Sequence, residues 1–392
     1  MNRSLKESFV KKAKTIYSNE NPIMLHRPIF EGNERNYLLE CIDSNYVSSV
    51  GSKVNEFEES VARFTGSKYA IATVNGTAAL HSAITLVGVK RGDEVLTQAL
   101  TFIATCNAID YCGARPIFID VDKDTMGMSP KALTFFLETN AEIKSGKAFN
   151  RISGKAISAC VPMHTFGFPC HIEEILEICN DWKIPLVEDA AESLGSFVNN
   201  KHTGTFGKVS TLSFNGNKLI TTGGGGMLLT DDLDIAKKAK HITTTAKVPH
   251  PYEFIHDEIG YNYRLPNLNA SLGCAQMQRL EEFLLIKEHV SREWKDFFER
   301  QDIKFMTAVK SNKANHWLNT IILNSKKDRD NFLEYTNKNA VMTRPVWRLM
   351  SDLEMFKDCF NDGLKNSKWL QDRIINIPSS VPNGMLSNRK DN

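Results

Sequence analysis

The chain has 392 residues, 24% of them charged and 42% hydrophobic, and its 48 Lys and Arg residues nearly balance its 46 Asp and Glu residues. A formal net charge of +2 gives no indication of the basic surface that nucleic-acid binding requires. No run reaches the roughly 18 to 20 apolar residues of a membrane span, and the first residues lack the apolar core of a secretory signal. We therefore expect a cytoplasmic protein that binds neither membranes nor nucleic acid.

Short β-branched runs alternate with amphipathic stretches from about residue 65 onward, which is the pattern of a parallel sheet covered by helices. The expected strands are 69–74, 93–98, 115–121, 156–162, 184–189, 209–214 and 226–231. The helices expected between them are 77–87, 102–112, 129–138 and 171–182. Sheets of this class bind ligands beyond the carboxyl ends of their strands, so residues that directly follow a strand are the candidate site.

The alternation of strands and helices ends after about residue 250. A polar, glycine-containing segment over 144–155 is predicted to be a surface insertion. A long helix is expected over about 267–300, followed by a strand at 316–323 and a helix at 329–339. We therefore predict a large domain with an amino-terminal arm over 1–250, and a connecting helix with a small α+β domain over 251–392.

The first strand runs into Asn-Gly-Thr-Ala-Ala-Leu (75–80) at the start of a helix. A helix N-terminus offers N–H groups and a partial positive charge, Gly76 lets the backbone approach a ligand, and Thr77 adds a hydroxyl donor. No Gly-Lys-Ser/Thr follows, which excludes a nucleotide P-loop. The segment is a candidate phosphate cradle, although a Gly-Thr pair is also common in an ordinary turn and helix cap.

A second candidate is Glu-Asp-Ala-Ala-Glu (188–192), at the end of a strongly apolar strand. A carboxylate such as Asp189 can keep the nitrogen of a pyridoxal ring protonated, so that the ring accepts electrons. Ala191 is small enough to leave room for a flat ring beside it. The alternative is that Asp189 only caps a helix.

The third candidate is Lys218, which ends the segment Ser-Phe-Asn-Gly-Asn-Lys (213–218) and is followed by four glycines at 223–226. A lysine placed after a strand with a flexible segment behind it is suited to form a Schiff base with an aldehyde. Taken alone, most lysines are solvated surface groups. Phe102 also follows a strand, where it either faces a planar cofactor or belongs to the core.

The eight cysteines show no short repeating spacing, which is typical of free thiols in a reducing compartment. Cys160, His164, Cys170 and His171 lie close together in sequence. Because no CxxC or HExxH pair is present to give tetrahedral ligand geometry, we predict no metal site.

Five motifs in order along the chain resemble those of the nucleotide-sugar aminotransferases of the DegT/DnrJ/EryC1/StrS family. They are NGTAAL (75–80), TFIATCNAI (101–109), EDAAES (188–193), SFNGNK (213–218) and GYNYRLPNLNASLG (260–273). The resemblance extends from about residue 23 to the end. It implies the α/β fold type I of pyridoxal-phosphate-dependent enzymes, with a seven-stranded, mostly parallel sheet in the large domain and a smaller C-terminal α+β domain.

The resemblance also implies roles for single residues. Lys218 would bind pyridoxal phosphate covalently, Asp189 would pair with its ring nitrogen and Phe102 would stack on the ring. The phosphate would be held by Gly76, Thr77, Ala78 and Ser213, and the positions beside the cofactor would be Ala191, Glu192 and Asn217. Asn262 resembles a phosphate ligand that family members donate from a second subunit, which implies a homodimer with shared active sites.

Two positions bear on the branch of the family. Many members have a carboxylate where this chain has Gly224, so any role of that carboxylate is in doubt here. Relatives that act as dehydratases carry histidine in place of the lysine, and Lys218 argues against that branch.

Within the family, the insertion at 144–155 together with VPMHTFG (161–167), SFNGNK, TTTAKVPH (243–250) and MTRPVW (342–347) most resembles the legionaminic-acid-pathway (LegC-type) aminotransferases. These are similar to enzymes of bacillosamine synthesis. The resemblance implies a UDP-linked 4-keto-6-deoxy-N-acetylhexosamine as substrate, glutamate as amino donor and pyridoxamine phosphate as the intermediate cofactor form. Arg344, Trp347 and His164 are candidate substrate-binding residues, with purely structural roles as the alternative.

Two other functions stay open at this stage. One is a 3-amino-sugar aminotransferase acting on a dTDP- or GDP-linked ketosugar, because the cofactor motifs would be the same. The other is a non-catalytic regulator that binds pyridoxal phosphate or a nucleotide sugar, against which the presence of both Lys218 and Asp189 argues.

Overall fold

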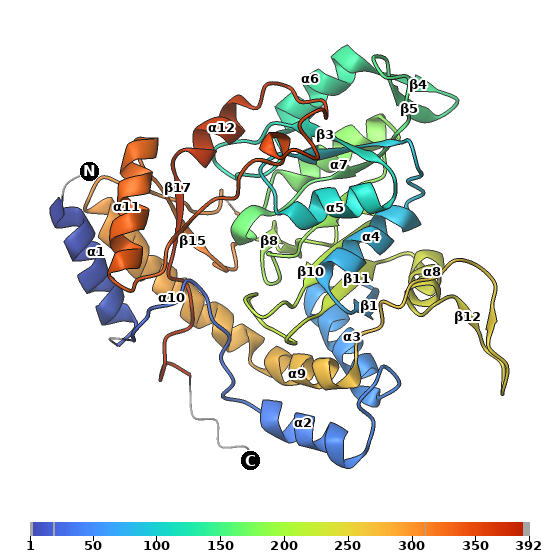
Figure 1. Ribbon diagram of the computed structural model, residues 1–392, viewed down its shortest axis with the longest axis horizontal. Helices are drawn as coiled ribbons and strands as arrows, with labels where there is room; N and C mark the ends of the chain where they lie inside the picture. Colours follow the sequence, from blue (N-terminus) through green and yellow to red (C-terminus); the bar gives the residue numbers. More distant parts are fainter. Residues whose placement is uncertain (1–2, 19, 310, 387–392) are drawn as a thin grey trace.

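The computed structural model describes residues 3–18, 20–309 and 311–386, and a central layer of strands covered by helices forms its main body (Figure 1). One hydrogen-bonded sheet has the order β1 (Tyr69–Thr73), β11 (Gly226–Thr230), β10 (Val209–Ser213) and β7 (Val187–Asp189). A second has the order β3 (Arg115–Ile119), β2 (Glu94–Gln98) and β6 (Ile157–Val161). All seven strands lie within the ranges expected from the sequence.

The two sheets meet along β6 and β7, where the isolated parallel bridges Cys160↔Leu186 and Met163↔Asp189 join them. The expected sheet is therefore divided into a four-stranded and a three-stranded part, because the short β7 makes only isolated bridges to β6. Strand β11 is antiparallel to β1 and β10, whereas β10–β7, β2–β3 and β2–β6 are parallel. The parallel strands end at a common edge, which is where the candidate residues lie.

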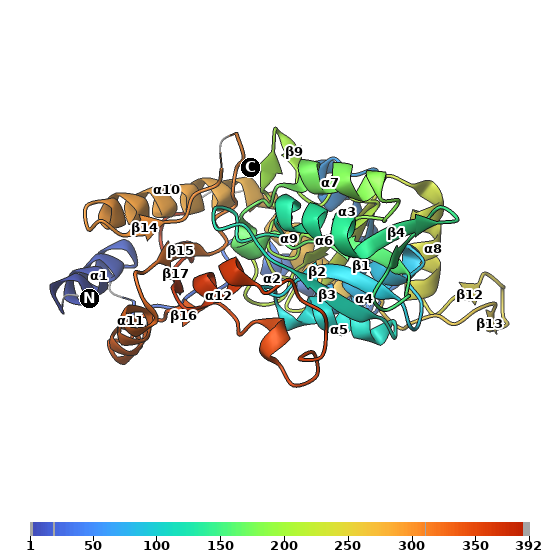
Figure 2. The same cartoon turned by 90° about the horizontal axis from the view of Figure 1, so that it is seen from above.

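Both faces of this layer are covered, because neighbouring strand residues point to opposite sides. On β2, Val95 belongs to the hydrophobic cluster that also contains residues of α4 (Gly76–Leu86), α5 (Ile103–Tyr111) and α8 (Leu233–Thr243). Leu96, the next residue, belongs to the cluster that contains residues of α6 (Pro130–Asn140) and α7 (Ile172–Asp181). Figure 2 shows α4 and α5 on one side of the strands and α7 on the other. The helices expected between the strands are therefore confirmed, with ends that differ by one or two residues.

The C-terminal part contains a small sheet with the order β14 (Lys304–Phe305), β15 (Asn319–Ile322), β17 (Ile374–Ile377) and β16 (Arg344–Pro345). Its helices are α11 (Lys326–Lys338) and α12 (Lys365–Gln371). Helix α1 (Arg3–Ile16) lies beside α11 in Figures 1 and 2, and the ring of Phe9 lies 4.8 Å from that of Phe332. The amino-terminal helix thus packs against the C-terminal part of the chain.

The long helix expected over 267–300 is two helices, α9 (Asn267–Gln278) and α10 (Leu280–Glu299). Arg279 separates them with φ −109° and ψ 0°, outside the helical range. Helix α9 packs against α2 (Glu34–Asp43) and α3 (Ser52–Thr65), whereas α10 carries Trp294 into the core that contains Phe9. Where the helices meet they share one core, which contains Cys274 of α9 and Phe283 of α10, and only the later part of α10 reaches the core around Phe9.

Three hairpins project from the body: β4 (Ala141–Lys144) with β5 (Lys147–Asn150), β8 (Phe197–Val198) with β9 (Lys201–His202), and β12 (Lys247–Val248) with β13 (Ile255–His256). The first contains part of the insertion expected over 144–155, which therefore begins earlier as an ordered hairpin. Within the part of the chain that the structure describes, no helix has the length and apolar character needed to cross a bilayer.

Asn315 joins the C-terminal part to the large sheet. Its Nδ2 donates to the carbonyl oxygens of Glu192 (2.8 Å) and Leu194 (2.9 Å), and its Oδ1 accepts from the N–H of Trp317 (2.8 Å). Gly167 has φ +90°, and a Cβ there would lie 1.9 Å from Asn315 Oδ1. Only glycine allows this close approach.

We predict that Gly167→Ala lowers the free energy of unfolding far more than Gly88→Ala. Both residues have a φ near +90°, but a Cβ on Gly88 meets nothing within 4 Å. The control variant Gly88→Ala is therefore destabilised only by its left-handed backbone, by about 1–2 kcal/mol. Gly167→Ala also displaces the Asn315 amide, so we expect its free energy of unfolding to fall by at least about 2 kcal/mol more than that of Gly88→Ala. Denaturant unfolding of both variants measures the difference, and equal losses would contradict this role of Gly167.

Candidate active site

A cavity of about 310 Å³ lies beyond the carboxyl ends of β1, β7 and β10. This volume is at the lower end of the roughly 300–1,000 Å³ that is usual for ligand pockets. Most of the expected site residues line it: Gly76, Thr77, Phe102, Asp189, Ala191, Glu192, Ser213, Asn217, Lys218 and Trp347. The structure therefore gathers into one cavity residues from five separate segments of the chain.

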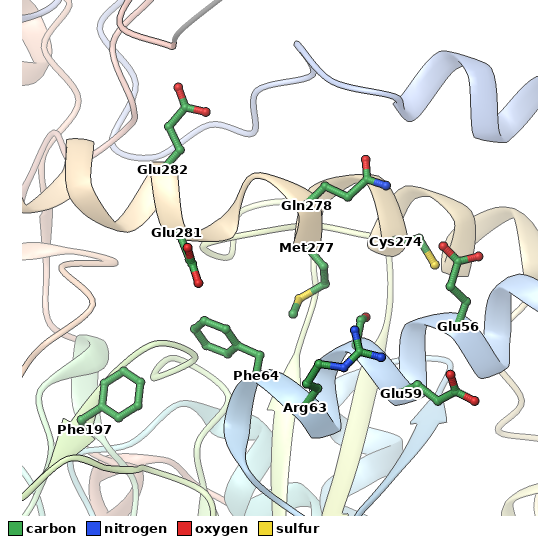
Figure 3. A pocket seen from close by; sticks show the side chains of 11 residues that line it. Glu56, Glu59, Arg63, Phe64, Phe197, Cys274, Met277, Gln278, Glu281 and Glu282 are labelled. Atoms are coloured by element: carbon green, nitrogen blue, oxygen red, sulfur yellow. The ribbon is translucent and has the colours of Figure 1, made fainter. Parts of the chain in front are cut away.

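A larger hollow of about 810 Å³ lies between α3, α9 and the start of α10 (Figure 3). Phe64 and Met277 extend into it from facing helices, and Glu281 points into the same space. Glu56 is paired there with Lys53 at 3.0 Å, and Glu282 with Arg279 at 2.7 Å. Because this hollow lies away from the carboxyl ends of the strands, we regard the smaller cavity as the active site.

The N-terminus of α4 forms one end of the cavity. Asn75 caps the helix, with its Oδ1 accepting from the N–H of Ala78 at 2.8 Å. Gly76 and Thr77 line the cavity, and a Cβ on Gly76 would lie 2.9 Å from Ser213 Cβ. The absence of that Cβ brings the Ser213 hydroxyl close to the helix N-terminus, which is an arrangement suited to a phosphate group.

Asp189 lies at the end of β7 and is almost completely buried. Its Oδ2 accepts from the hydroxyl of Thr105 at 2.7 Å, and its Oδ1 accepts from the N–H of Ala191 at 3.2 Å. Burial raises the pKa of the Asp189 carboxyl, while these two donors and the Lys218 cation act in the opposite direction. Asp189 also lines the cavity, so the lone pairs that these donors leave free can accept a hydrogen bond from a ligand there.

Lys218 lies between a carboxylate and an aromatic face. Its Nζ is 3.1 Å from Glu192 Oε1 and 4.2 Å from the centre of the Trp317 ring. Burial raises the pKa of Glu192, although the charge of Lys218 and a hydrogen bond from the N–H of Phe166 oppose the increase. The indole Nε1–H of Trp317 donates to the carbonyl oxygen of Asn217 at 2.7 Å, so Trp317 contacts the lysine and also fixes the backbone before it.

An aromatic wall completes the cavity. The ring centres of Phe102 and Trp347 are 6.0 Å apart, and those of Phe166 and Trp347 are 4.8 Å apart. Phe102 and Trp347 were expected from the sequence, but Trp317 was not. Trp317 precedes a short strand in a segment with no motif of its own, so only its position in the fold identifies it.

Four expected residues do not line this cavity. The N–H of Ala78 is already bonded to the cap, as described above. His164 is buried behind the site, where its Nε2 contacts Glu188 (3.0 Å) and its Nδ1 accepts from the N–H of Cys170 (3.2 Å). Arg344 is exposed and donates to Asn337 Oδ1. His164 and Arg344 therefore lie outside the cavity, and their expected contacts with the substrate stay predictions.

Asn262 is also outside the cavity of its own chain. It is exposed, and its Oδ1 accepts from Arg264 Nε at 3.0 Å. Its expected role on a second subunit stays a prediction.

Glu188, next to Asp189, forms a separate buried network on the other side of β7. Its Oε1 accepts from the N–H groups of Phe206 and Gly207, both at 2.6 Å, and its Oε2 accepts from the N–H of Gly204 at 2.7 Å. Burial raises the pKa of this carboxyl, but the bond from His164 and the backbone donors outweigh burial and lower it overall. Glu188 thereby fixes the loop over 204–207 and, through β7, the position of Asp189.

Comparisons with known proteins agree with this geometry. The model of the DegT/DnrJ/EryC1/StrS aminotransferase family matches residues 28–384. EpsN of Bacillus subtilis (strain 168), named as a pyridoxal phosphate-dependent aminotransferase, is 37% identical over 85% of this chain and 84% of its own length. The GDP-perosamine synthase of Escherichia coli O157:H7 is 33% identical over 91% of this chain and 93% of its own. PseC of Helicobacter pylori, a solved aminotransferase involved in the biosynthesis of pseudoaminic acid, has a TM-score of 0.83 at 21% identity and covers 92% of this chain and 94% of PseC.

The chain belongs to the DegT/DnrJ/EryC1/StrS aminotransferase family and is a pyridoxal-phosphate-dependent sugar aminotransferase. This confirms the family expected from the five sequence motifs, and the narrower resemblance to legionaminic-acid-pathway enzymes stays a prediction. The cavity fits the cofactor, because it combines a helix N-terminus, a buried carboxylate, an amine and aromatic faces. Lys218, Asp189 and Gly76 are the residues that would hold its aldehyde, ring nitrogen and phosphate.

We predict that Glu188→Gln lowers the free energy of unfolding at pH 7 by about 3–5 kcal/mol, because an amide NH₂ would face backbone donors. The exposed Glu177→Gln should change it by less than about 0.5 kcal/mol. The pKa of Glu188 is lowered in the folded state. Its stabilisation of the folded protein is therefore complete above the unfolded-state pKa of about 4.3, and this stabilisation is lost as the pH falls below that pKa. Unfolding measured from pH 7 to pH 3 should show wild type and Glu188→Gln converging, and a constant difference would contradict this assignment.

Proposed function

We propose that the enzyme transfers an amino group from glutamate to a UDP-linked 4-keto-6-deoxy-N-acetylhexosamine, giving the 4-amino sugar for a bacterial surface glycan of the legionaminic acid or bacillosamine type. The observation that supports the chemistry is the position of the Lys218 amine in one cavity with Asp189 and the N-terminus of α4. The choice of sugar rests on the motifs that include MTRPVW and the insertion at 144–155.

Pyridoxal phosphate, when bound, supplies an aldehyde that condenses with amines and a ring that takes up the electron pair left after removal of a proton from carbon. Asp189 would accept a hydrogen bond from the protonated ring nitrogen and balance its charge. The N–H groups of Gly76 and Thr77, with the Ser213 hydroxyl, bind the phosphate. Phe102 and Ala191 line the positions beside the ring.

Lys218 has two roles in this proposal. Its Nζ would be the covalent attachment point for the cofactor, and as a free amine it would be the base that removes a proton from the α-carbon of glutamate. Glu192 Oε1, at 3.1 Å, holds the amine in place while it carries that proton. Trp317 covers the other side of the amine, with the ring centre 4.2 Å from Nζ.

The nucleotide of the substrate has a second candidate. The similarity to GDP-perosamine synthases, which reaches 33% identity, favours a GDP-linked sugar. A 3-amino-sugar product on a dTDP- or GDP-linked ketosugar is the other enzymatic alternative. A non-catalytic binding role is disfavoured by the ion-paired Lys218 and the buried Asp189 in one cavity.

We also propose a homodimer in which Asn262 binds the phosphate in the partner's cavity. The hairpin β12–β13 and the residues around it project from the body in Figures 1 and 2. Tyr252 and Phe254 are both 80% exposed and Ile259 is 85% exposed, which is unusual for apolar side chains on one short segment. A second copy of the chain would cover them.

We predict that the protein reconstituted with pyridoxal phosphate shows a visible absorption band that disappears when glutamate is added. Lys218→Ala should abolish the covalent attachment and the response to glutamate, whereas Lys208→Ala, at an exposed lysine, should keep both. The measurement is the visible spectrum before and after glutamate. A wild-type protein that gives no band, or a Lys218→Ala variant whose band responds normally to glutamate, would contradict the assignment of Lys218.

A panel of ketosugars separates the candidate substrates. With glutamate as donor, we expect mass spectrometry to detect an amino sugar from the UDP-linked 4-keto-6-deoxy-N-acetylhexosamine at a kcat/KM at least about tenfold above the GDP- and dTDP-linked sugars, a difference of about 1.4 kcal/mol in transition-state binding. Preferred turnover of the GDP-linked sugar would select the second candidate. Turnover only of a 3-keto sugar would reject amination at C4.

Hybrid dimers test the shared site. If Asn262 acts in the partner's cavity, a hybrid of one Lys218→Ala chain and one Asn262→Ala chain has one site that lost both residues and one intact site. Co-production with two affinity tags and tandem purification gives this hybrid. We expect about half of wild-type activity from it, while each parent homodimer is strongly impaired. Activity no higher than that of the Asn262→Ala parent would show that Asn262 serves its own chain or neither site.

A further inference from the structure

A chain of buried hydroxyl groups leads to Asp189 from the start of α5. The hydroxyl of Thr105 lies 2.7 Å from Asp189 Oδ2, and the hydroxyl of Thr101 lies 2.9 Å from that of Thr105. Thr101 Oγ1 is also 3.0 Å from the sulfur of Met163. Thr101 and Thr105 are both fully buried, so water does not reach this chain of contacts.

Thr105 differs from other helical threonines in this protein. Thr85 and Thr243 donate to the carbonyl oxygen four residues earlier, at 2.8 Å and 2.7 Å, which is the usual local bond of a threonine in a helix. The hydroxyl of Thr105 instead bonds to Asp189, which is distant in sequence. Its side chain therefore serves the carboxylate rather than its own helix.

The direction of these hydrogen bonds depends on the protonation of Asp189, because each hydroxyl has a single hydrogen. With Asp189 ionised, Thr105 donates to Oδ2 and Thr101 donates to Thr105. With Asp189 protonated on Oδ2, the order reverses and Thr101 must donate to the Met163 sulfur, which is a weak acceptor. The backbone N–H of Ala191 on Oδ1 can only donate. The arrangement therefore favours the carboxylate form.

This preference opposes the effect of burial. Desolvation raises the pKa of Asp189, and Thr105 is the largest of the contributions that lower it. Two other ionisable groups that face Asp189 favour its charged form, the Lys218 amine and the His164 ring. The charge of Asp189 in turn raises the pKa of Glu192 and of the Cys106 thiol. Of these, Lys218 changes its bonding partner in the proposed reaction, whereas Thr105 stays in place.

We propose that Thr105, supported by Thr101, is a positioning residue that holds Asp189 as an oriented carboxylate throughout the reaction cycle. The proposal rests on the proposed role of Asp189 toward the ring nitrogen. Thr105 does not touch the cofactor, and it acts only through the hydrogen bond to Asp189 Oδ2.

The test uses Thr105→Val, which keeps the shape of the side chain but removes the hydroxyl, and Thr105→Ser, which restores it. With pyridoxal phosphate labelled with ¹⁵N in the ring, the ¹⁵N chemical shift reports whether the nitrogen is protonated. We expect the pH at which the nitrogen loses its proton to fall by about one unit in Thr105→Val and to return toward wild type in Thr105→Ser. Thr243→Val, at a buried threonine bonded within its own helix, should leave it unchanged.

Activity gives a second readout. We expect kcat of Thr105→Val at pH 7 to fall about tenfold with a smaller change in KM, because the change affects the electron-accepting state of the ring rather than substrate binding. An unchanged ¹⁵N titration in Thr105→Val, even with reduced stability, would overturn the proposal and leave Thr105 a packing residue.

Cofactor-free protein provides an arm that does not depend on the proposed function. Without the Thr105 hydroxyl, ionisation of the buried Asp189 is less favourable in the folded state, so the destabilisation by Thr105→Val should grow as the pH rises from 4 to 8. For Thr243→Val the destabilisation should not depend on pH. A loss of stability in Thr105→Val that does not change with pH would contradict the proposal that Thr105 supports the Asp189 carboxylate. Failure of the wild type to bind the cofactor would instead reject the proposed function.

Discussion

Two adjacent buried carboxylates, Glu188 and Asp189, impose the main constraint on this structure. Because successive residues of a strand point to opposite faces, Glu188 faces the protein interior and Asp189 faces the cavity. A buried charge must be compensated by donors or by an opposite charge. The loop over 204–207 donates backbone N–H groups to Glu188, and Thr105 of α5 and the N–H of Ala191 donate to Asp189, so the two carboxylates fix different segments on the two sides of β7.

The same principle links the C-terminal part of the chain to the site. The positive charge of the Lys218 amine is balanced by Glu192, in the segment after β7, and the amine also contacts the face of Trp317, in the segment before β15. Asn315 bonds to the backbone of both Glu192 and Trp317, so these two partners of Lys218 are held in a fixed relation. The geometry of the amine thus depends on the joint between the two parts of the fold.

The sequence predicted what depends on local periodicity and on motifs, namely the seven strands, the helices between them and ten of the residues that line the cavity. A sequence pattern does not decide where a side chain has a choice of partners: His164 follows a strand, and its ring bonds to Glu188 behind the cavity. Trp317 and Thr105 could not be identified as site residues, because their roles arise from contacts between segments distant in sequence. The break between α9 and α10 at Arg279 was not predicted either, because no local sequence pattern marks it.

The packing of α1 has a consequence for synthesis of the protein in the cell. Phe9 and Tyr17 are completely buried, and Phe9 packs against Trp294 and Phe332, which the ribosome adds long after α1. At about 5–20 residues per second, the apolar face of α1 waits roughly 15 seconds to a minute for its partners. During that interval the strands of the main body can form while α1 stays unpacked. The nascent chain then exposes an apolar helix face to which holdase chaperones can bind.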